Sequence, residues 1–354
     1  MYIVLGALLF GLLIVIHELG HFTAAKRLGV KVNEFAIGMG PKIFSRQRGE
    51  TVYALRALPF GGACMMEGED EDNPDPRAFT AQKAWKRIVI LAAGAFMNLL
   101  FGFIIVLILQ MGNMYLTSTT LGGFMDGYPN EGEHGLMVGD TIYAVDGERT
   151  RYVEDFGLFM DMPSAADGFV DLTIVRDGQK IKYENFDMQL REYEIDGVKQ
   201  MKIGLYFRGI TPTLGARFNH AVSTAANYVR LVKIGLVQLF SGGAKLSDLS
   251  GPVGLVAVIN ESANDPQLPS VGDRIIRVLG LGALIAVNLG VMNLLPIPAL
   301  DGGRIVGVLI TSVVEKVTQR RINPKYEGYI HAGGLVLLML LMVAVMVSDI
   351  VKLL

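Results

Sequence analysis

The sequence has a single cysteine, only five histidines and no excess of charge of one sign among its 354 residues. Because Cys64 has no partner within the chain, no internal disulfide can hold the water-exposed parts together, and these parts need a core of their own. The net charge of −2 offers no electrostatic attraction for a polyanion, which argues against a nucleic-acid partner. The protein is therefore predicted to be neither a disulfide-stabilised protein nor one that binds nucleic acid through its net charge.

Apolar residues, by contrast, are abundant. Hydrophobic residues make up 51% of the chain and the mean hydropathy is +0.41, which is high for a soluble domain, whereas 19% charged residues is too many for a chain wholly in lipid. The composition predicts a protein that lies partly in a membrane. The opening run "MYIVLGALLFGLLIVI" lacks the basic leader and cleavage site of a signal peptide, so we expect a retained helix.

Four segments are long and apolar enough to cross a hydrocarbon layer of about 30 Å, which takes roughly 20 helical residues. Lys and Arg concentrate after the first and third segments, which predicts cytoplasmic loops there, with the N-terminus, the long middle segment and the C-terminus outside. The predicted fold class is a polytopic α-helical membrane protein with a membrane-associated β-sheet loop and one extracytoplasmic α+β domain. The predicted parts are a first span 1–24, a β-loop region 25–86, a second span 87–112, an outer domain 113–210, an amphipathic helix and linker 211–272, a third span 273–303, a cytoplasmic loop 304–328 and a fourth span 329–354.

Turn residues mark two β-rich regions. Between residues 30 and 65, segments rich in β-formers are separated by Gly and Pro, which predicts a small sheet beside the membrane. In the outer domain, Asp177-Gly178 and Asp196-Gly197 predict two hairpins. Residues 215–241 are amphipathic, and this helix lies either at the membrane interface or, equally, on the outer domain. The acidic run 67–76 is typical of a solvated loop.

The pentapeptide "HELGH" ends the first span. Residues four apart share a helix face, so His17 and His21 can bind one Zn²⁺ while Glu18 reaches a water at the metal. A catalytic zinc usually takes three protein ligands and keeps a fourth position for water. The pentapeptide supplies two of these ligands, so a third has to come from elsewhere in the chain.

Asp301 is the carboxylate that lies at matching depth in the other spans, and we predict that it is the third ligand. Ionisable groups at membrane depth are costly and therefore point to function. Pro296 and Pro298 should break the helix before it, and Gly302-Gly303 allows a close backbone approach. The remaining histidines are predicted to be surface or interfacial residues: His134, His220 and His331.

These motifs resemble those of the site-2 protease family (peptidase family M50), intramembrane zinc metalloproteases that cut transmembrane substrates. The likeness covers essentially the whole chain, with "HELGH" and "NLLPIPALDGGR" (293–304) similar to the two zinc motifs of the family. "SGPVGL" (250–255) and "AAGAFMN" (92–98) resemble further segments, although Ala95 stands where many bacterial members have Pro. "HGLMVGDTIYAVDGERT" (134–150) is similar to the core of a PDZ domain, and one such unit points to the single-PDZ, RseP/RasP-like bacterial type.

The resemblance implies one Zn²⁺ per chain, held by His17, His21 and Asp301, with Glu18 as catalytic base. It further implies regulated intramembrane proteolysis of single-span membrane proteins, such as anti-sigma factors or signal-peptide remnants, already cleaved by another protease. The place would be the bacterial plasma membrane, with the PDZ-like domain outside and the zinc site near the cytoplasmic side.

Substrate contacts are predicted from the loop sheet and from two amides. An unwound substrate could add to an edge strand near "LPFGG", and amide side chains could hold its backbone or the oxyanion. For both amides, a hydrogen bond between helices is an equal alternative. The predicted substrate-binding residues are Leu58, Phe60, Gly61, Gly62, Asn98 and Asn293.

Other functions remain open or are disfavoured. A catalytically inactive PDZ-bearing membrane scaffold is the main alternative, and it would tolerate Glu18→Gln. A transporter would need more intramembrane polar groups and a repeated topology. The sequence has no Gly-x-Ser-x-Gly elbow and no paired intramembrane carboxylates, which disfavours serine and aspartyl chemistry. The outer domain either admits only trimmed substrates or binds a new C-terminus.

Overall fold

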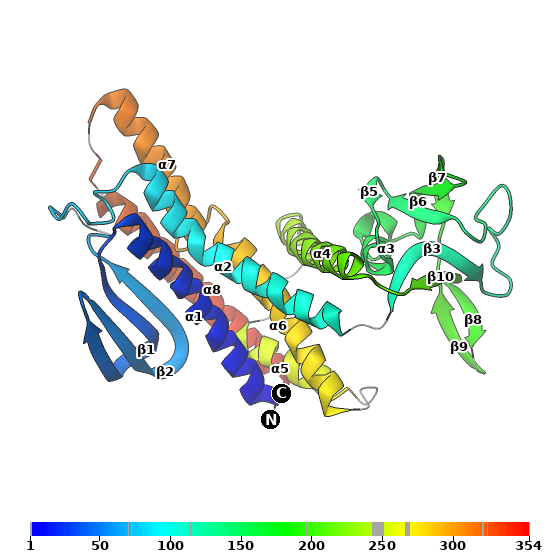
Figure 1. Ribbon diagram of the computed structural model, residues 1–354, viewed down its shortest axis with the longest axis horizontal. Helices are drawn as coiled ribbons and strands as arrows, with labels where there is room; N and C mark the ends of the chain where they lie inside the picture. Colours follow the sequence, from blue (N-terminus) through cyan, green and yellow to red (C-terminus); the bar gives the residue numbers. More distant parts are fainter. Residues whose placement is uncertain are drawn as a thin grey trace. The chain divides into compact units, whose positions relative to one another are not determined.

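The chain divides into a mainly helical unit and a mainly β unit. The computed structural model describes residues 2–69, 71, 73–112, 115–195, 197–242, 251–265, 270–320, 322–323 and 325–353. The helical unit comprises Met1–Ile105 and Gly235–Leu354, and the β unit comprises Val106–Ile234. Figure 1 labels most elements of both units.

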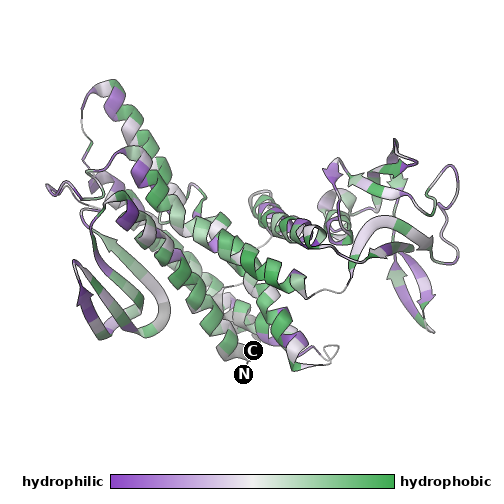
Figure 2. Ribbon diagram, viewed as in Figure 1, coloured by the Kyte–Doolittle hydropathy of each residue, from purple (hydrophilic) through white to green (hydrophobic). Residues whose placement is uncertain are grey.

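Among the residues that the structure describes, four helices are long and apolar enough to cross a membrane. They are α1 (Tyr2–Leu28), α2 (Ala84–Met111), α6 (Val271–Asn293) and α8 (Lys325–Leu353). Figure 2 shows long hydrophobic stretches along all four. The four predicted apolar helices are thus confirmed by length and composition, and their placement across a membrane stays a prediction.

Strands β1 (Val32–Arg48) and β2 (Thr51–Met66) form an antiparallel sheet in which each strand bends back on itself. Phe35 pairs with both Tyr53 and Cys64, so the order across the sheet is 62–66, 32–37, 51–56 and 42–48. The ring of Phe22 on α1 packs against the ring of Phe35, with 5.1 Å between centroids. The predicted small sheet is confirmed, with residues 62–66 at one edge and 42–48 at the other.

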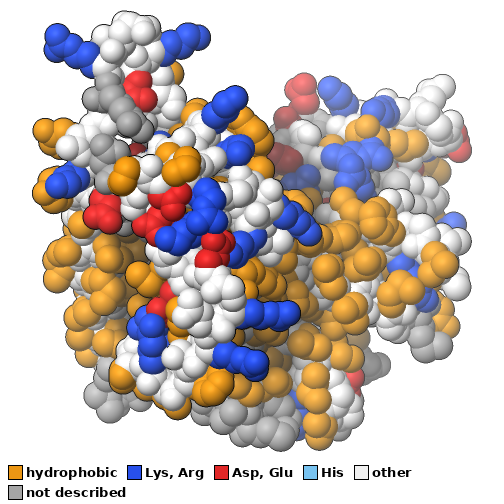
Figure 3. All heavy atoms as spheres, turned by 60° about the vertical axis from the view of Figure 1, so that its left-hand side comes forward, with side chains coloured by type: hydrophobic (Ala, Val, Ile, Leu, Met, Phe, Trp, Pro, Cys, Tyr) orange, Lys and Arg blue, Asp and Glu red, His pale blue; other side chains and the backbone are white. Residues whose placement is uncertain are grey.

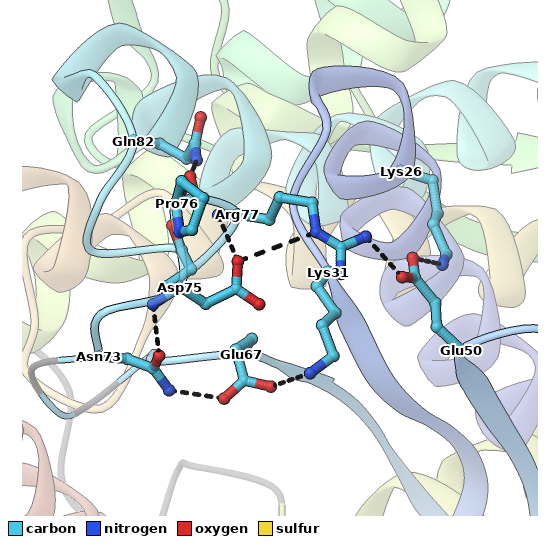
Figure 4. A network of polar contacts seen from close by, with 10 residues as sticks. Lys26, Lys31, Glu50, Glu67, Asn73, Asp75, Pro76, Arg77 and Gln82 are labelled. Carbon is cyan, nitrogen blue, oxygen red and sulfur yellow. Dashed lines mark hydrogen bonds and ion pairs between the residues drawn. The ribbon is translucent and has the colours of Figure 1, made fainter.

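A network of ion pairs joins the loop after β2 to the end of α1 and to the β1–β2 turn (Figure 4). Glu50 accepts from Lys26 and from Arg77 at 2.7 Å each, and Glu67 accepts from Lys31 at 2.7 Å. The hydrogen bonds from Lys26 and Arg77 hold the pKa of Glu50 below its usual range. Figure 3 shows acidic and basic side chains gathered together next to broad apolar areas. The acidic run predicted as a solvated loop contributes to this network near both of its ends, through Glu67 and through Asp75, whose carboxylate lies 3.8 Å from Arg77.

Two shorter helices also lie in the described part of the helical unit. Helix α7 (Asp301–Thr318) occupies most of the segment 304–328, which was predicted to be a cytoplasmic loop, because its apolar residues recur at helical spacing and Val308 is buried. Helix α5 (Pro252–Ala263) begins where the backbone N–H groups of Gly251 and Gly254 donate to Asp349 of α8, at 2.8 Å each. Ser250 of the "SGPVGL" segment lies outside the described residues.

The β unit is built on a sheet with strand order β10-β3-β4-β6-β7, in which β5 pairs with β4. Its strands are β3 (Leu116–Phe124), β4 (Thr141–Val145), β5 (Glu148–Arg149), β6 (Phe169–Arg176), β7 (Gln179–Asp187) and β10 (Leu205–Ile210). The hairpin predicted at Asp177-Gly178 joins β6 to β7, with φ of 50° and 77° at its turn. The second predicted hairpin pairs β8 (Arg191–Ile195) with β9 (Val198–Lys202), and Asp196 at its turn lies outside the described residues. The likeness to a PDZ domain stays a prediction.

Helix α4 (Leu214–Phe240) packs on the β unit beside α3 (Val153–Met160), after which a short helical turn, η1 (Pro163–Ala165), follows. Asp155 of α3 is 1% exposed and accepts hydrogen bonds from Ser223 at 2.9 Å and from Asn227 at 2.6 Å. His220 is also buried, in contrast to the surface or interfacial position predicted for it, with Nε2 3.2 Å from a carboxylate oxygen of Glu154. Of the two alternatives for this amphipathic helix, these contacts favour packing on the outer domain.

Candidate metal centre

His17 and His21 project from one face of α1, as their spacing predicts. Their Nε2 atoms lie 3.1 Å apart. Both side chains are largely buried, with exposed fractions of 13% and 8%. The Nδ1 atom of His21 lies 2.9 Å from the backbone carbonyl oxygen of Ile90 on α2. Because that nitrogen donates its proton to the carbonyl, the Nε2 atom of a neutral His21 carries a free lone pair.

Asp301 reaches the same point from the first turn of α7. Its Oδ2 atom lies 3.1 Å from Nε2 of His17 and 3.2 Å from Nε2 of His21. The loop before it folds back tightly, since a Cβ atom on Gly302 would lie 2.2 Å from the carbonyl oxygen of Leu295. The close backbone approach expected at Gly302 is therefore present, and it directs the start of α7 toward α1.

The three side chains suit a divalent metal. Among the described residues, His17, His21 and Asp301 form the group of potential ligands whose donor atoms all lie within 4.8 Å of one another. A tetrahedral zinc with ligands about 2.0–2.1 Å away holds neighbouring donor atoms about 3.3 Å apart, close to the observed separations. Two imidazoles and one carboxylate also match the donor set of catalytic zinc sites that keep an open position.

Two glycines let α1 and α2 approach closely enough for this arrangement, and neither was predicted to be functional from the sequence. A Cβ atom on Gly94 would lie 2.4 Å from Nε2 of His21 and 2.8 Å from Cε1 of His17. A Cβ atom on Gly20 would lie 2.4 Å from the carbonyl oxygen of Ala93. The signal in the sequence was the run of small residues "AAGA" at positions 92–95, opposite a glycine inside "HELGH".

Glu18 is half-buried and lies next to the sheet. A Cβ atom on Gly62 of β2 would come within 2.8 Å of Cγ of Glu18. Residues 62–66, which begin at Gly62, pair with 32–37 on one side, and no described strand pairs with their other side. A hollow of about 590 Å³ lies beside this strand, lined among others by Cys64, Met65 and Arg304. The predicted base and an unpaired strand edge are thus neighbours.

The other predicted substrate-binding residues lie outside the strand 62–66. Leu58 is half exposed and pairs with Met39 where the strands bend, and Gly61 follows with φ of 83°. The side chain of Phe60 lies outside what the structure describes. Asn293 is the last residue of α6. Asn98 is 1% exposed on α2, close to His17.

His331 of α8 is buried, in contrast to the surface or interfacial position expected for it. Its Nδ1 atom accepts a hydrogen bond from the backbone N–H of Ala299 at 3.2 Å. Ala299 has φ of 79°, a backbone conformation that costs energy for a residue with a Cβ atom. The hydrogen bond from Ala299 to His331 therefore helps to hold the loop that precedes Asp301.

Comparison with known proteins agrees with the motif likeness. A family model described as peptidase family M50 matches residues 5–341. A relative from Clostridium perfringens, named as a zinc metalloprotease, is 36% identical over 352 residues that cover 99% of both chains. A relative of the same kind from Fusobacterium nucleatum is 33% identical over 100% of this chain and 99% of its own. The regulator of sigma-W protease RasP from Bacillus subtilis is 27% identical over 98% of this chain and 97% of its own.

Proposed function

The chain belongs to peptidase family M50, and from this membership we propose that it is an intramembrane protease that cuts single-span membrane proteins. Its relatives are zinc metalloproteases, so the protein is a metalloendopeptidase that uses Zn²⁺. The observation that carries the proposal is that His17 and His21 of α1 and Asp301 of α7 bring their donor atoms to one point. We assign these three residues as the zinc ligands.

The chemistry follows from the residues around that point. When bound, zinc supplies a Lewis acid that polarises the scissile carbonyl and acidifies water. Glu18, one step round the helix from the ligands, takes a proton from the attacking water and later delivers it to the leaving amine. The packing of Gly62 against Glu18 limits where that carboxylate can go. Asn293, at the end of α6, is the amide proposed to contact substrate backbone.

Strand addition explains how a helical substrate could be cut. A transmembrane helix hides its carbonyl groups in its own hydrogen bonds, so it has to unwind before hydrolysis. The free edge of residues 62–66 offers backbone partners to an unwound segment. Because this edge begins beside Glu18, a strand added to it would pass the metal centre with its carbonyl groups exposed to attack.

Substrate class and location extend the proposal. The name of the Bacillus subtilis relative refers to sigma-W, and we propose by analogy that this chain acts on membrane proteins of the anti-sigma-factor kind. We further propose that the β unit lies outside the cytoplasm and favours substrates already trimmed by another protease. The ion-paired surface of Lys26, Lys31 and Arg77 would then face the cytoplasm.

The test uses the full chain in lipid vesicles with a synthetic single-span peptide as substrate and a photoreactive residue at Met65. We expect cleavage within the spanning segment and cross-links from Met65 to substrate positions flanking the cut, because Met65 is exposed on the free edge. The matched control carries the photoreactive residue at Phe44, exposed on the opposite edge, and should give few cross-links.

Two outcomes would contradict separate parts of this account. Cleavage with equal cross-linking from both edges would reject strand addition at residues 62–66 but keep the protease function. A zinc-loaded protein that leaves every single-span peptide intact would reject the proposed function and favour the scaffold alternative.

A further inference from the structure

Asn98 is one of the most buried polar side chains of α2, with 1% of its surface exposed. Its Nδ2 atom lies 3.5 Å from Nδ1 of His17, the ring nitrogen that faces away from Asp301. Its Oδ1 atom is buried and has no hydrogen-bond partner among the described residues. A buried amide oxygen without a donor is unusual in a folded protein and calls for an explanation.

The chemistry of a metal-binding imidazole supplies that explanation. A neutral imidazole has one protonated nitrogen and one nitrogen with a lone pair. If Nε2 of His17 gives its lone pair to a metal, the proton has to be on Nδ1. An amide N–H facing this N–H would set two donors against each other while the amide oxygen beside them stays unpaired.

Rotating the amide of Asn98 by half a turn would place its oxygen next to the Nδ1 proton of His17. The two donors would then no longer face each other, and the oxygen would have a donor. The oxygen and nitrogen of an amide are almost the same size, so the exchange needs no extra space. We propose that the side-chain oxygen of Asn98 accepts the Nδ1 proton of His17 and so holds the imidazole with its Nε2 lone pair on the metal. This inference rests on the proposed role of His17 as a ligand.

The same helix provides the matching contact for the second imidazole. Ile90, Gly94 and Asn98 follow one another at steps of four residues on α2, and such residues share one face of a helix. The carbonyl oxygen of Ile90 accepts from Nδ1 of His21 at 2.9 Å. Gly94 leaves room for both rings, and Asn98 reaches His17. One face of α2 thus contacts the Nδ1 atoms of both histidines, on the side of each ring away from Asp301.

Asn98 is therefore a positioning residue, and its contact with His17 matches the hydrogen bond between helices that was the equal alternative to a substrate contact. Hydrogen bonds to the far nitrogen of a ligating histidine fix its tautomer and ring orientation, and their loss typically weakens metal binding about 10–100-fold. With 1% exposure behind His17, the Asn98 amide has little access to a substrate strand.

The experiment measures zinc affinity of the purified full-length protein by competition with a chelator. Asn98→Leu keeps the size of the side chain and removes the acceptor, and we expect zinc affinity to fall about 10–100-fold. Asn98→Asp keeps an acceptor oxygen and removes the amide nitrogen, and we expect it to bind zinc at least as tightly as the wild type. His17→Ala is measured alongside, and the visible spectrum of the cobalt-substituted protein reports ligand geometry in each variant.

The outcomes separate this inference from the proposed function. If Asn98→Asp loses zinc as Asn98→Leu does, or if Asn98→Leu binds zinc like the wild type while His17→Ala does not, the inference is wrong and the ligand assignment survives. Unchanged zinc affinity in Asn98→Leu together with a raised KM would restore the substrate contact. If His17→Ala binds zinc as tightly as the wild type, the ligand assignment itself fails. Should Asn98→Leu not fold, Asn98→Asp alone still decides which end of the amide is needed.

Discussion

Glu18→Gln is expected to abolish peptide-bond cleavage while zinc content stays at one per chain. Removal of a general base typically costs about 10²–10⁴-fold in rate, and the amide can neither take a proton from water nor return one to the leaving amine. Zinc should remain because Glu18 lies outside the group formed by His17, His21 and Asp301. The measurement is turnover of a single-span substrate in vesicles, with zinc counted in the same preparation.

A matched control separates the base from general effects of charge. Glu50→Gln removes a carboxylate that is paired with Lys26 and Arg77 and belongs to the ion-pair network. It should leave turnover within a small factor of the wild type. Full activity in Glu18→Gln would show that another group takes the proton. If neither the wild type nor Glu18→Gln cleaves substrate and both still support biological function, the scaffold alternative would be favoured.

Gly94→Ala is expected to remove zinc and activity together. The added methyl group would lie 2.4 Å from Nε2 of His21 and 2.7 Å from its Cε1, far inside van der Waals contact. The imidazole cannot move away without losing either Asp301 or the carbonyl oxygen of Ile90. Bound zinc should therefore fall as far as it does in His21→Ala.

Gly112→Ala provides the control at the other end of the helical segment. A Cβ atom there would lie 3.6 Å from the carbonyl oxygen of Leu109, which is an ordinary contact. Thermal unfolding of both variants shows whether the chain still folds. A folded Gly94→Ala protein that keeps zinc and turnover would mean that the helices do not approach at this glycine as described.

The proposed ligands could be predicted from the sequence because two of them follow a local pattern. His17 and His21 are four residues apart on a helix, and the requirement for a third ligand at similar depth led to Asp301. That Asp301 reaches the site from a new helix, rather than from the end of the third apolar one, depends on the backbone of the intervening loop. The positive φ of Ala299 in that loop has no clear signal in the sequence.

The support of the site could not be predicted because it depends on how helices cross. Gly94 in "AAGA" is like any small residue of an apolar helix until Gly20 and the two imidazoles are placed against it. Asn98 was predicted as a substrate-binding amide, with a hydrogen bond between helices as the equal alternative, but its proximity to His17 depends on the rotation of α2. Local residue types identify such positions, and only tertiary packing assigns their partners.

The pairing in the β1–β2 sheet and the packing of α4 likewise depend on tertiary structure that the sequence does not reveal. Turn residues predicted strands between 30 and 65, but they did not reveal that β1 and β2 each pair twice, which leaves residues 62–66 at an edge beside Glu18. The amphipathic pattern of α4 fitted a membrane surface as well as a protein surface. The buried carboxylate of Asp155, which binds Ser223 and Asn227, favours the protein surface.

Zinc K-edge X-ray absorption of the purified protein, compared with Asp301→Ala, tests the central claim most directly. We predict light-atom ligands at about 2.0–2.2 Å with outer-shell scattering from two imidazoles, and a changed or lost zinc signal in Asp301→Ala. Sulfur at about 2.3 Å, a third imidazole, or an unchanged spectrum in Asp301→Ala would contradict the proposal that His17, His21 and Asp301 hold the metal.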